Sequence, residues 1–465
     1  MQTNLQTTTA AMDNKTKIMW AIAVILPLMI MLIPTNESFT PEIRIFLAST
    51  LWGVLMFAFE VLDNTITALV LPFTYVIFKL APMNVVFSPW TQTIPWMVLG
   101  GLLLANILER IGLLKRMAYW CIVKTGGTYN GIIYGLIFAG ILINFAKPGS
   151  SPVAIAALTY GICKAFNLGK SKAACGIMIA GAVGTLVPGF FIYTPGNLGV
   201  MLGTASSVQP LPISFVEYFM QNVVFIPLIF ILGFMITKVM KPEVNIDGKD
   251  YFVEQQKSLG KMSNDEKKTC FILVVLVTYL LTTNIHKMDM AYGFVILPAL
   301  LFFPGLKVGK KEDIQRVNYA FMIFIASCMS IGAVATKLGL GQLISNAVLP
   351  IMENANSFTL IGIVWLLAVS VNFLLTPLAA MATLGAPMAQ IALDLGISPY
   401  PLMYAFFQGL DQLILPYEYA LYLIFFSFGL IHLKDFMKVF AWKMLICGVY
   451  LMAIGVPYWI FIGLL

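Results

Sequence analysis

The sequence predicts an all-α polytopic membrane protein made of two halves that repeat each other. Of its 465 residues, 60% are hydrophobic and only 11% are charged, against about 25% charged residues in a typical soluble domain. The mean hydropathy is +0.89. One long polar stretch lies near the middle of the chain, and short patterns on one side of it recur in the same order on the other.

This composition excludes a soluble enzyme, a nucleic-acid-binding protein and a secreted disulfide scaffold. At about 20 residues per apolar span, the length leaves room for on the order of ten to twelve membrane crossings. The six cysteines stand singly, without the C-x-x-C spacing of redox or zinc sites, and there are only two histidines. We therefore expect no enzymatic activity, no metal centre and no nucleic-acid partner, with the lipid bilayer as the surroundings.

The charges around the first and last apolar segments predict the orientation. The run from Ile18 to Ile33 has no small-residue cleavage site and predicts a transmembrane helix that is not removed as a signal. Lys15 and Lys17 precede it, so the positive-inside rule places the N-terminus in the cytoplasm. No charge follows Lys443, and we expect the C-terminus outside. The predicted location is multi-pass in a cell membrane, either an inner or a plasma membrane.

The longest polar stretch, residues 238–268, divides the hydrophobic mass in two. Its surplus of lysine predicts a cytoplasmic linker between a first half, residues 1–237, and a second half, residues 269–465. Further basic loops are expected at two places, residues 307–316 and Lys434, Lys438 and Lys443.

Three landmarks recur in the same order in the two halves, and such repeats fix an architecture. The first is a helix that ends in a Gly-Leu turn. The second is an Asn-Phe pair followed by a proline-containing break, a short apolar arm and a closing Leu-Gly. The third is a broken segment. The paired segments are Leu99 to Leu114 with Ala326 to Gly341, Asn144 to Gly169 with Asn372 to Gly396, and Gly184 to Leu202 with Gly409 to Ile424.

The second landmark predicts a re-entrant hairpin in each half, at residues 131–165 and 358–394, followed by broken helices at 184–202 and 409–424. The arms of the first hairpin are shorter than the roughly 20 residues of a full span, so we expect its tip at membrane depth. Irregular backbone is tolerated there only where it is buried in protein or lines a wet cavity. Interrupted segments at corresponding places in two halves point to the binding site of a secondary transporter. Two kinked helices remain the alternative.

The tip of the first hairpin predicts an anion site. It comprises Lys147, Pro148, Gly149, Ser150 and Ser151. Serine caps free helix amides and proline is favoured at the first helical position, so a helix start points into the tip. Helix N-termini favour anions, and Lys147 adds a full positive charge where an ionisable side chain is costly unless it is paired or functional. The alternative is that Lys147 reaches the membrane surface.

The second half places its polar groups differently. They are Thr376 and Pro377 at the hairpin tip, and Asp411, Gln412, Pro416 and Glu418 at the second break. Buried carboxylates pair with cations or take up protons. Asp411, Gln412 and Glu418 are therefore candidates for charge pairing or coupling, and Lys147 is the expected cationic partner of Asp411 or Glu418. A place in a loop mouth remains the alternative for the carboxylates.

Three stretches resemble the divalent anion:sodium symporter (DASS) family. Residues Glu60 to Pro72 are similar to the family's glutamate and T-A-L-L-P run. Residues 105–118 are similar to its A-x-E-x-x-G-L-x-x-R-x-A signature. Thr194-Pro195-Gly196-Asn197 is similar to the T-P-P-N of its first broken helix. The resemblance implies uptake of di- and tricarboxylates or sulfate. It also implies a homodimer with a scaffold domain and an elevator-type transport domain, and a substrate site lined by Thr194, Pro195 and Asn197.

The sequence departs from the family at the hairpin tips. Where the family has Ser-Asn-Thr, which contacts substrate carboxylates and borders sodium, this chain has Lys147-Pro148-Gly149 and Thr376-Pro377-Leu378. We therefore expect no resident cofactor and favour exchange of small organic anions, with Lys147 as a fixed cation, over sodium symport. A sodium ion near Gly184, Thr185 and Asn197 stays open. Proton-coupled symport and a cation:proton antiporter are further alternatives.

Overall fold

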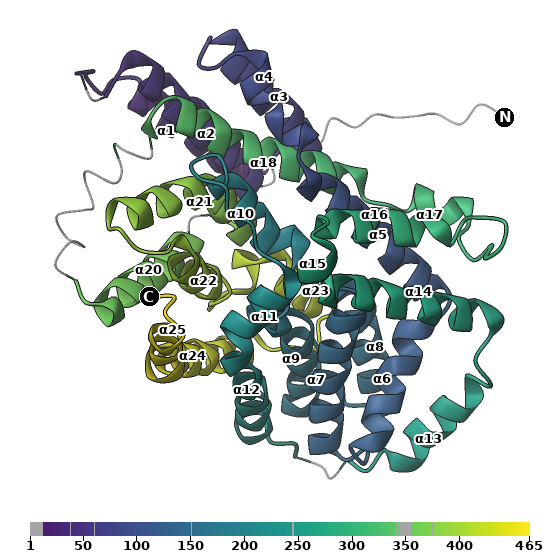
Figure 1. Cartoon of the computed structure of the whole chain (residues 1–465). Helices are drawn as coiled ribbons and strands as arrows, with labels where there is room; N and C mark the ends of the chain where they lie inside the picture. The colour runs from purple at the N-terminus through teal and green to yellow at the C-terminus, as the bar shows by residue number, and fades with distance from the viewer. Residues whose placement is uncertain are drawn as a thin grey trace, which may run out of the picture.

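The protein is all α-helical, as its composition predicts (Figure 1). The structure is a computed structural model that describes residues 13–37, 39–59, 61–149, 151–243, 246–340, 343, 355–373 and 375–465. Within these ranges no β-strand is present, and an isolated bridge pairs Thr128 with Asp247.

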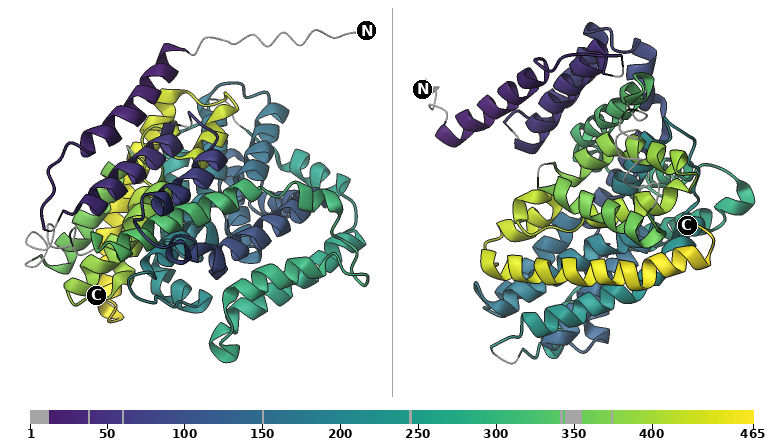
Figure 2. Two further views of the ribbon diagram at one scale, coloured as in Figure 1. Left: turned by 90° about the horizontal axis from the view of Figure 1, so that it is seen from above. Right: turned by 90° about the vertical axis from the view of Figure 1, so that its left-hand side faces the viewer.

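The N-terminal helices form one end of the molecule. They are α1 Asn14–Ile30, α2 Pro41–Phe59, α3 Asn64–Ile77 and α4 Met83–Val86, with the 3₁₀ turn η1 Ser88–Thr91. α1 corresponds to the first predicted transmembrane helix and packs on α2, and α2 packs on α3. Figure 2 shows α1 and α2 projecting from the remaining helices. α3 joins this end to the second half, because it packs on α18 (Tyr319–Lys337).

The Gly-Leu turn of the first half is a sharp bend between two helices. α5 (Thr93–Arg110) and α6 (Leu113–Lys124) meet at 68°. Gly112 allows this turn with a φ of +79°, which residues with a Cβ rarely adopt. Arg110 is paired with Asp313 at 2.7 Å, which fixes the end of α5 to α17 (Lys311–Gln315). α5 also packs on α16 (Met290–Leu300) of the second half.

The first hairpin and the first broken helix follow along the chain. α7 and α8 flank the predicted tip, where Gly149 has a φ of +113°. Pro188 and Pro195 then interrupt the next helix, because proline lacks the amide hydrogen that a continuous helix needs. The elements are α7 Tyr129–Ala146, α8 Pro152–Ala165, α9 Lys172–Leu186, the 3₁₀ turn η2 Val187–Phe190, the π turn η3 Pro195–Gly199 and α10 Val200–Ala205.

The second half repeats this series of elements. Thr376 precedes the second hairpin arm with Pro377 at its first position, and Pro416 interrupts the following helix. The elements are α20 Ser357–Asn372, α21 Pro377–Asp394, α22 Pro399–Leu410, the 3₁₀ turn η5 Pro416–Glu418 and α23 Ala420–Ser427.

The two series interlock. In each half both hairpin arms pack on the helix that precedes the break: α7 and α8 on α9, and α20 and α21 on α22. The segments after the breaks cross over, since α10 packs on α21 and α23 packs on α8. Each half therefore supplies part of the packing surface of the other, and the segment after each break packs on a hairpin arm of the opposite half.

The predicted linker contains a helix and is fastened to the first half. α13 (Lys249–Ser258) packs on α6, and Phe252 is buried against the rings of Tyr119 and Phe166. Arg116 of α6 is paired with Glu266 at 2.6 Å. The flanking elements are α11 Phe215–Asn222, the 3₁₀ turn η4 Val223–Phe225, α12 Ile226–Val239, α14 Asn264–Leu281 and α15 Thr283–His286.

The C-terminal segment overturns one prediction. α24 (Leu433–Tyr450) continues through the π turn η6 (Leu451–Gly455) into α25 (Val456–Phe461). Lys443 was expected in a basic loop, but it lies inside α24 with 1% of its surface exposed. The prediction was wrong because a lysine stands inside an apolar helix when partner groups compensate its charge.

Fewer helices are long enough to span a membrane than the length alone suggests. Among the described residues, five helical segments are long and apolar enough to cross, or six if the bent pair α5–α6 counts as one span. The shorter apolar helices include α3, α8, α16 and α20. The difference arises in part because α8, α20 and the segments after the two breaks are below the length of a span, whereas the hairpin arm α7, with 18 residues, is long enough to cross.

Candidate functional site

A cavity of about 790 Å³ lies where the two broken helices meet α3 and α18. Its wall consists largely of the starts of four helices, together with Asn197 of η3. The lining residues at these starts include Asp63 and Thr65 of α3, Asn318 of α18, Thr376 and Pro377 of α21, and Tyr419 and Ala420 of α23. Both halves of the chain thus contribute to one cavity.

Two of the four helix starts carry no side-chain cap. At α3 and α18, the side chains of Asp63 and Asn318 accept hydrogen bonds from backbone amides of the first turn. Thr376 and Tyr419 precede α21 and α23 and make no such capping bond. The free amides and the positive dipole ends of α21 and α23 therefore lie at the cavity, an arrangement that favours a negatively charged occupant.

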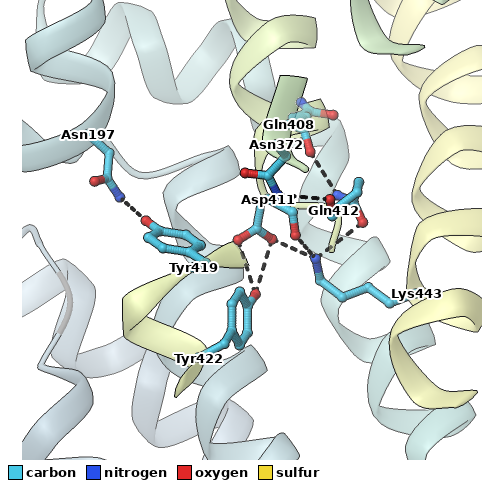
Figure 3. Close-up of polar contacts among 8 residues, drawn as sticks. All are labelled: Asn197, Asn372, Gln408, Asp411, Gln412, Tyr419, Tyr422 and Lys443. Carbon is cyan, nitrogen blue, oxygen red and sulfur yellow. Dashed lines mark hydrogen bonds and ion pairs between the residues drawn. The ribbon is translucent and has the colours of Figure 1, made fainter. Parts of the chain in front are cut away.

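Asn197 and Tyr419 join the two breaks across the cavity wall. Asn197 Nδ2 donates a hydrogen bond to Tyr419 Oη at 3.0 Å, as Figure 3 shows. Asn197 belongs to the first broken helix and Tyr419 immediately precedes the second half of the other, so this bond links segments 222 positions apart in sequence. Any movement of one break relative to the other has to change this contact.

Only some of the predicted binding residues line the cavity. Asn197, Thr376 and Pro377 do. Thr194 is buried and its main-chain oxygen accepts a hydrogen bond from the amide of Asn197 at 3.3 Å, and Pro195 is the first residue of η3. The second hairpin tip, which has no charge, thus contributes to the cavity wall.

The first hairpin tip lies apart from the described wall of this cavity. Lys147 is buried, and its Nζ lies 3.4 Å from Ser151 Oγ. Pro148 and Gly149 complete the described part of this tip, and Ser150 lies outside the described residues, as does Glu60. The described tip residues are not among those that line the cavity, and the anion site expected at Lys147 stays a prediction.

Asp411 has a different cationic partner from the one the sequence suggested. Lys443 Nζ lies 2.7 Å from Asp411 Oδ2, whereas Lys147 was the expected partner. The Tyr422 hydroxyl donates to the same carboxylate at 3.1 Å, and Gln412 Oε1 lies 3.2 Å from the ammonium (Figure 3). The sequence could not indicate this pair, because 31 residues separate Asp411 from Lys443 and only the folded chain brings α24 to the end of α22.

The side chain of Glu418 accepts hydrogen bonds from backbone amides of the second break, in which it lies. Its carboxylate accepts the amide of Leu415 at 2.8 Å and lies 3.3 Å from the amide of Ile414. Pro416 begins the short turn that this carboxylate closes. The side chain therefore satisfies backbone amides of the break, whereas its charge had suggested pairing with a cation or a proton.

The region proposed for sodium lies at the end of α9. Gly184 packs closely on Gly140 and on the backbone of Leu136, and the main-chain oxygen of Thr185 accepts a hydrogen bond from Asn144 Nδ2 at 3.0 Å. Among the described residues, Asn144 Oδ1 and Thr194 Oγ1 are buried without a hydrogen-bond partner. Oxygen atoms of this kind suit a hard cation. No group of three His, Cys, Asp or Glu side chains within the described ranges could hold a metal ion.

Sequence reasoning missed Tyr419 and Lys443. Tyr419 directly follows Glu418, so the alignment of the second break with Thr194 to Asn197 already pointed to its surroundings. Lys443 is the last charge of the chain and stands in an otherwise apolar stretch. A charge in such a stretch is by default a functional candidate, and this was the signal that could have found it.

Hairpins, broken helices and a central cavity within an apolar helical body define a secondary membrane transporter. The chain belongs to the family described as the sodium:sulfate symporter transmembrane region, whose profile matches residues 14–465. This match confirms the resemblance to the DASS family over nearly the whole chain, and it agrees with the expectation that the protein is not an enzyme.

Solved structures of membrane transporters share the fold, among them the following two. The YdaH transporter of Alcanivorax borkumensis aligns with a TM-score of 0.55 and 13% identity over 97% of this chain and 99% of its own. MtrF of Neisseria gonorrhoeae, described among a class of antimetabolite efflux pumps, aligns with a TM-score of 0.54 and 13% identity over 96% of this chain and 95% of its own. At this identity the likeness concerns the fold alone. No curated protein sequence is significantly similar to the chain.

Proposed function

We propose that the protein carries a small organic anion, a di- or tricarboxylate, across the membrane by alternating access. The observation that carries this proposal is the cavity at which the uncapped starts of α21 and α23 converge. Free amides and helix dipoles attract anions without a full charge having to be buried at the site. The volume of about 790 Å³ lies in the usual range for small-molecule sites, which is roughly 300 to 1,000 Å³.

Exchange of one anion for another is the favoured form of transport. The tips lack the Ser-Asn-Thr side chains that would help to hold sodium, and the chain places a buried lysine, Lys147, at the first hairpin tip and another, Lys443, at the second break. Sodium symport is the alternative, supported by the unpartnered oxygens of Asn144 and Thr194. Proton coupling through Glu418 and a cation:proton antiporter have less support, because the Glu418 carboxylate is already engaged by backbone amides.

Lys147 remains a proposed second anion ligand. Its ammonium is buried at the first tip beside Ser151, which precedes α8 without making a side-chain cap. An anion that reaches this tip during the transport cycle would meet both the ammonium and the start of α8.

The proposed orientation makes the cavity face the cytoplasm. The basic segment 307–316 directly precedes α18, whose start lines the cavity, and the positive-inside rule places this segment in the cytoplasm. The N-terminus is then cytoplasmic and the C-terminus outside. We further propose two inverted repeats and a homodimer in which α7 to α12 and α20 to α24 move as an elevator against a scaffold. The position of the cavity between α3, α18 and the broken helices supports this division.

The test is uptake of labelled succinate into proteoliposomes, with and without an internal dicarboxylate and with sodium or choline outside. Uptake that requires the internal dicarboxylate and is equal in sodium and choline is the expected result. Uptake into empty vesicles driven by a sodium gradient would replace exchange by sodium symport. Absence of saturable uptake of succinate, citrate and sulfate under all conditions would refute the proposed substrate class.

A further inference from the structure

The side chain of Lys443 is enclosed by oxygen atoms at the end of α22 (Figure 3). Its Nζ lies 2.6 Å from the main-chain oxygen of Asp411, 2.7 Å from Asp411 Oδ2 and 3.2 Å from Gln412 Oε1. The rings of Tyr422 and Phe440 lie 5.6 and 5.7 Å from the ammonium. A carbonyl, a carboxylate and an amide oxygen around one point are also the ligand types that hard cations prefer.

The location of this oxygen cage requires a cation. Asp411 is the residue that follows α22, so the free carbonyls and the negative dipole end of that helix lie there. The Asp411 carboxylate adds a full negative charge, although only 5% of the residue is exposed. A buried carboxylate that loses its partner is strongly destabilising. The folded state is therefore more stable when a positive charge fills the cage.

The first half has no lysine at the matching place in its described residues. Its break follows Thr185, whose main-chain oxygen accepts a hydrogen bond from Asn144. In the second half, the main-chain oxygen of Gln412 accepts the corresponding hydrogen bond from Asn372. The charged residues of α9 and α12 stand only at helix ends, namely Lys172 and Lys238. The second break thus has a cation supplied by the chain itself, Lys443. The helices α9 and α12 supply no such cation to the first break.

We propose that the Lys443 ammonium is a tethered cation that occupies a site which a free monovalent cation would otherwise fill. The second break then binds no cation from solution, and its positive charge travels with the helices that carry the substrate cavity. This inference deepens the proposed exchange function and rests on it for its role in transport. The cation site itself is a property of Asp411, Gln412 and Lys443 that binding experiments detect without any substrate.

The experiment uses the purified full-length protein in detergent and measures its melting temperature against sodium, methylammonium and choline chloride at constant ionic strength. Lys443→Ala empties the cage and leaves its oxygens in place. We expect this variant to melt at a lower temperature than wild type in choline. Sodium or methylammonium should then raise its melting temperature saturably, beyond any effect on wild type, because a ligand that binds only the folded state stabilises it.

Two variants serve as controls. Asp411→Asn combined with Lys443→Met removes both charges at similar volume, and its melting temperature should not respond to sodium more than that of wild type. Arg116→Ala breaks the partly buried pair with Glu266 far from the breaks and reports any general effect of salt on a broken ion pair. If sodium or methylammonium raised the melting temperature of Arg116→Ala as much as that of Lys443→Ala, the proposal would be overturned.

The remaining outcomes also decide the question. If Lys443→Ala can be purified only in sodium or methylammonium, the proposal is supported. If it cannot be purified in any of the three salts while the neutral double variant can, the cage does not accept a free cation and the proposal fails. Because none of these measurements uses a carboxylate or sulfate, failure of succinate transport would count against the proposed function and leave this result standing.

Discussion

Asn144 and Asn372 make the same hydrogen bond in the two halves of the protein. Asn144 Nδ2 donates to the main-chain oxygen of Thr185 at 3.0 Å, and Asn372 Nδ2 to that of Gln412 at 3.2 Å. Each asparagine stands at the end of a first hairpin arm, and each acceptor at the end of the helix before a break. The two bonds therefore tie each hairpin tip to its own broken helix.

Replacing either asparagine should destabilise the protein. Asn144→Ala or Asn372→Ala leaves a buried carbonyl without its donor, and the expected cost is about 1–3 kcal/mol. Unfolding followed by temperature or denaturant measures it. Asn130→Ala, at an exposed position of α7, is the matched control and should stay within about 0.5 kcal/mol of wild type. If Asn130→Ala and Asn144→Ala lowered the free energy of unfolding equally, the proposed structural role of these hydrogen bonds would be contradicted.

Tyr419→Phe should weaken substrate binding more than it weakens the fold. The change removes one hydroxyl, which accepts the hydrogen bond from Asn197 at the cavity wall. We expect KM for anion uptake to rise severalfold with a small change in melting temperature. Tyr400→Phe removes a hydroxyl bonded to the main chain of Pro212, away from this cavity, and should leave KM unchanged. The idea fails if both variants change KM alike.

A negative charge at the start of α23 should abolish anion uptake without unfolding the protein. Ala420→Asp places a carboxylate in the first turn, where it interacts favourably with the helix dipole but repels an anion in the cavity. Ala420→Asn has nearly the same size and no charge, and it should retain most of the uptake. Saturable uptake that persists in Ala420→Asp would show that the anion binds elsewhere.

Lys147→Met tests the first hairpin tip. Methionine has a similar length and no charge, so the buried position stays filled while the ammonium is lost. If the tip contacts the anion during the cycle, the maximal rate of exchange should fall by at least tenfold in the proteoliposome assay. If Lys147→Met exchanged succinate at the rate of wild type, the Lys147 tip would have no role in binding the anion. The starts of α21 and α23 would then be the proposed anion ligands.

Arg110→Ala should lower stability because it leaves Asp313 without its cation. Arg110 donates to both oxygens of this carboxylate and to the main chain of Val308, and the Asp313 side chain is 1% exposed. Loss of one partner of a buried pair costs about 3–5 kcal/mol, so a value toward the lower end is expected for a half-buried arginine. Arg316→Ala, at an exposed position nearby, is the control. Comparable melting temperatures for the two variants would contradict this assignment.

The sequence by itself determined the fold class and indicated where helices end around the predicted hairpin tips and breaks. Hydropathy and charge place the chain in a membrane, and proline and glycine act locally, so residues such as Pro152, Gly149 and Pro416 locate the ends of helices without reference to the rest of the chain. The repeat also pointed to Asn197 in the first broken helix and to Thr376 at the second hairpin tip, and both line the cavity.

Only the tertiary structure decided which of these polar groups meet. The crossing of α10 onto α21 and of α23 onto α8 brings four helix starts to one cavity and leaves the described part of the Lys147 tip outside its wall. It also pairs Asp411 with Lys443, which local patterns cannot indicate because side-chain partners across a helix bundle depend on packing and not on spacing. Helix ends and breaks depend on residues that are close in sequence, whereas the pairing of a buried charge depends on which helices pack together in the folded protein.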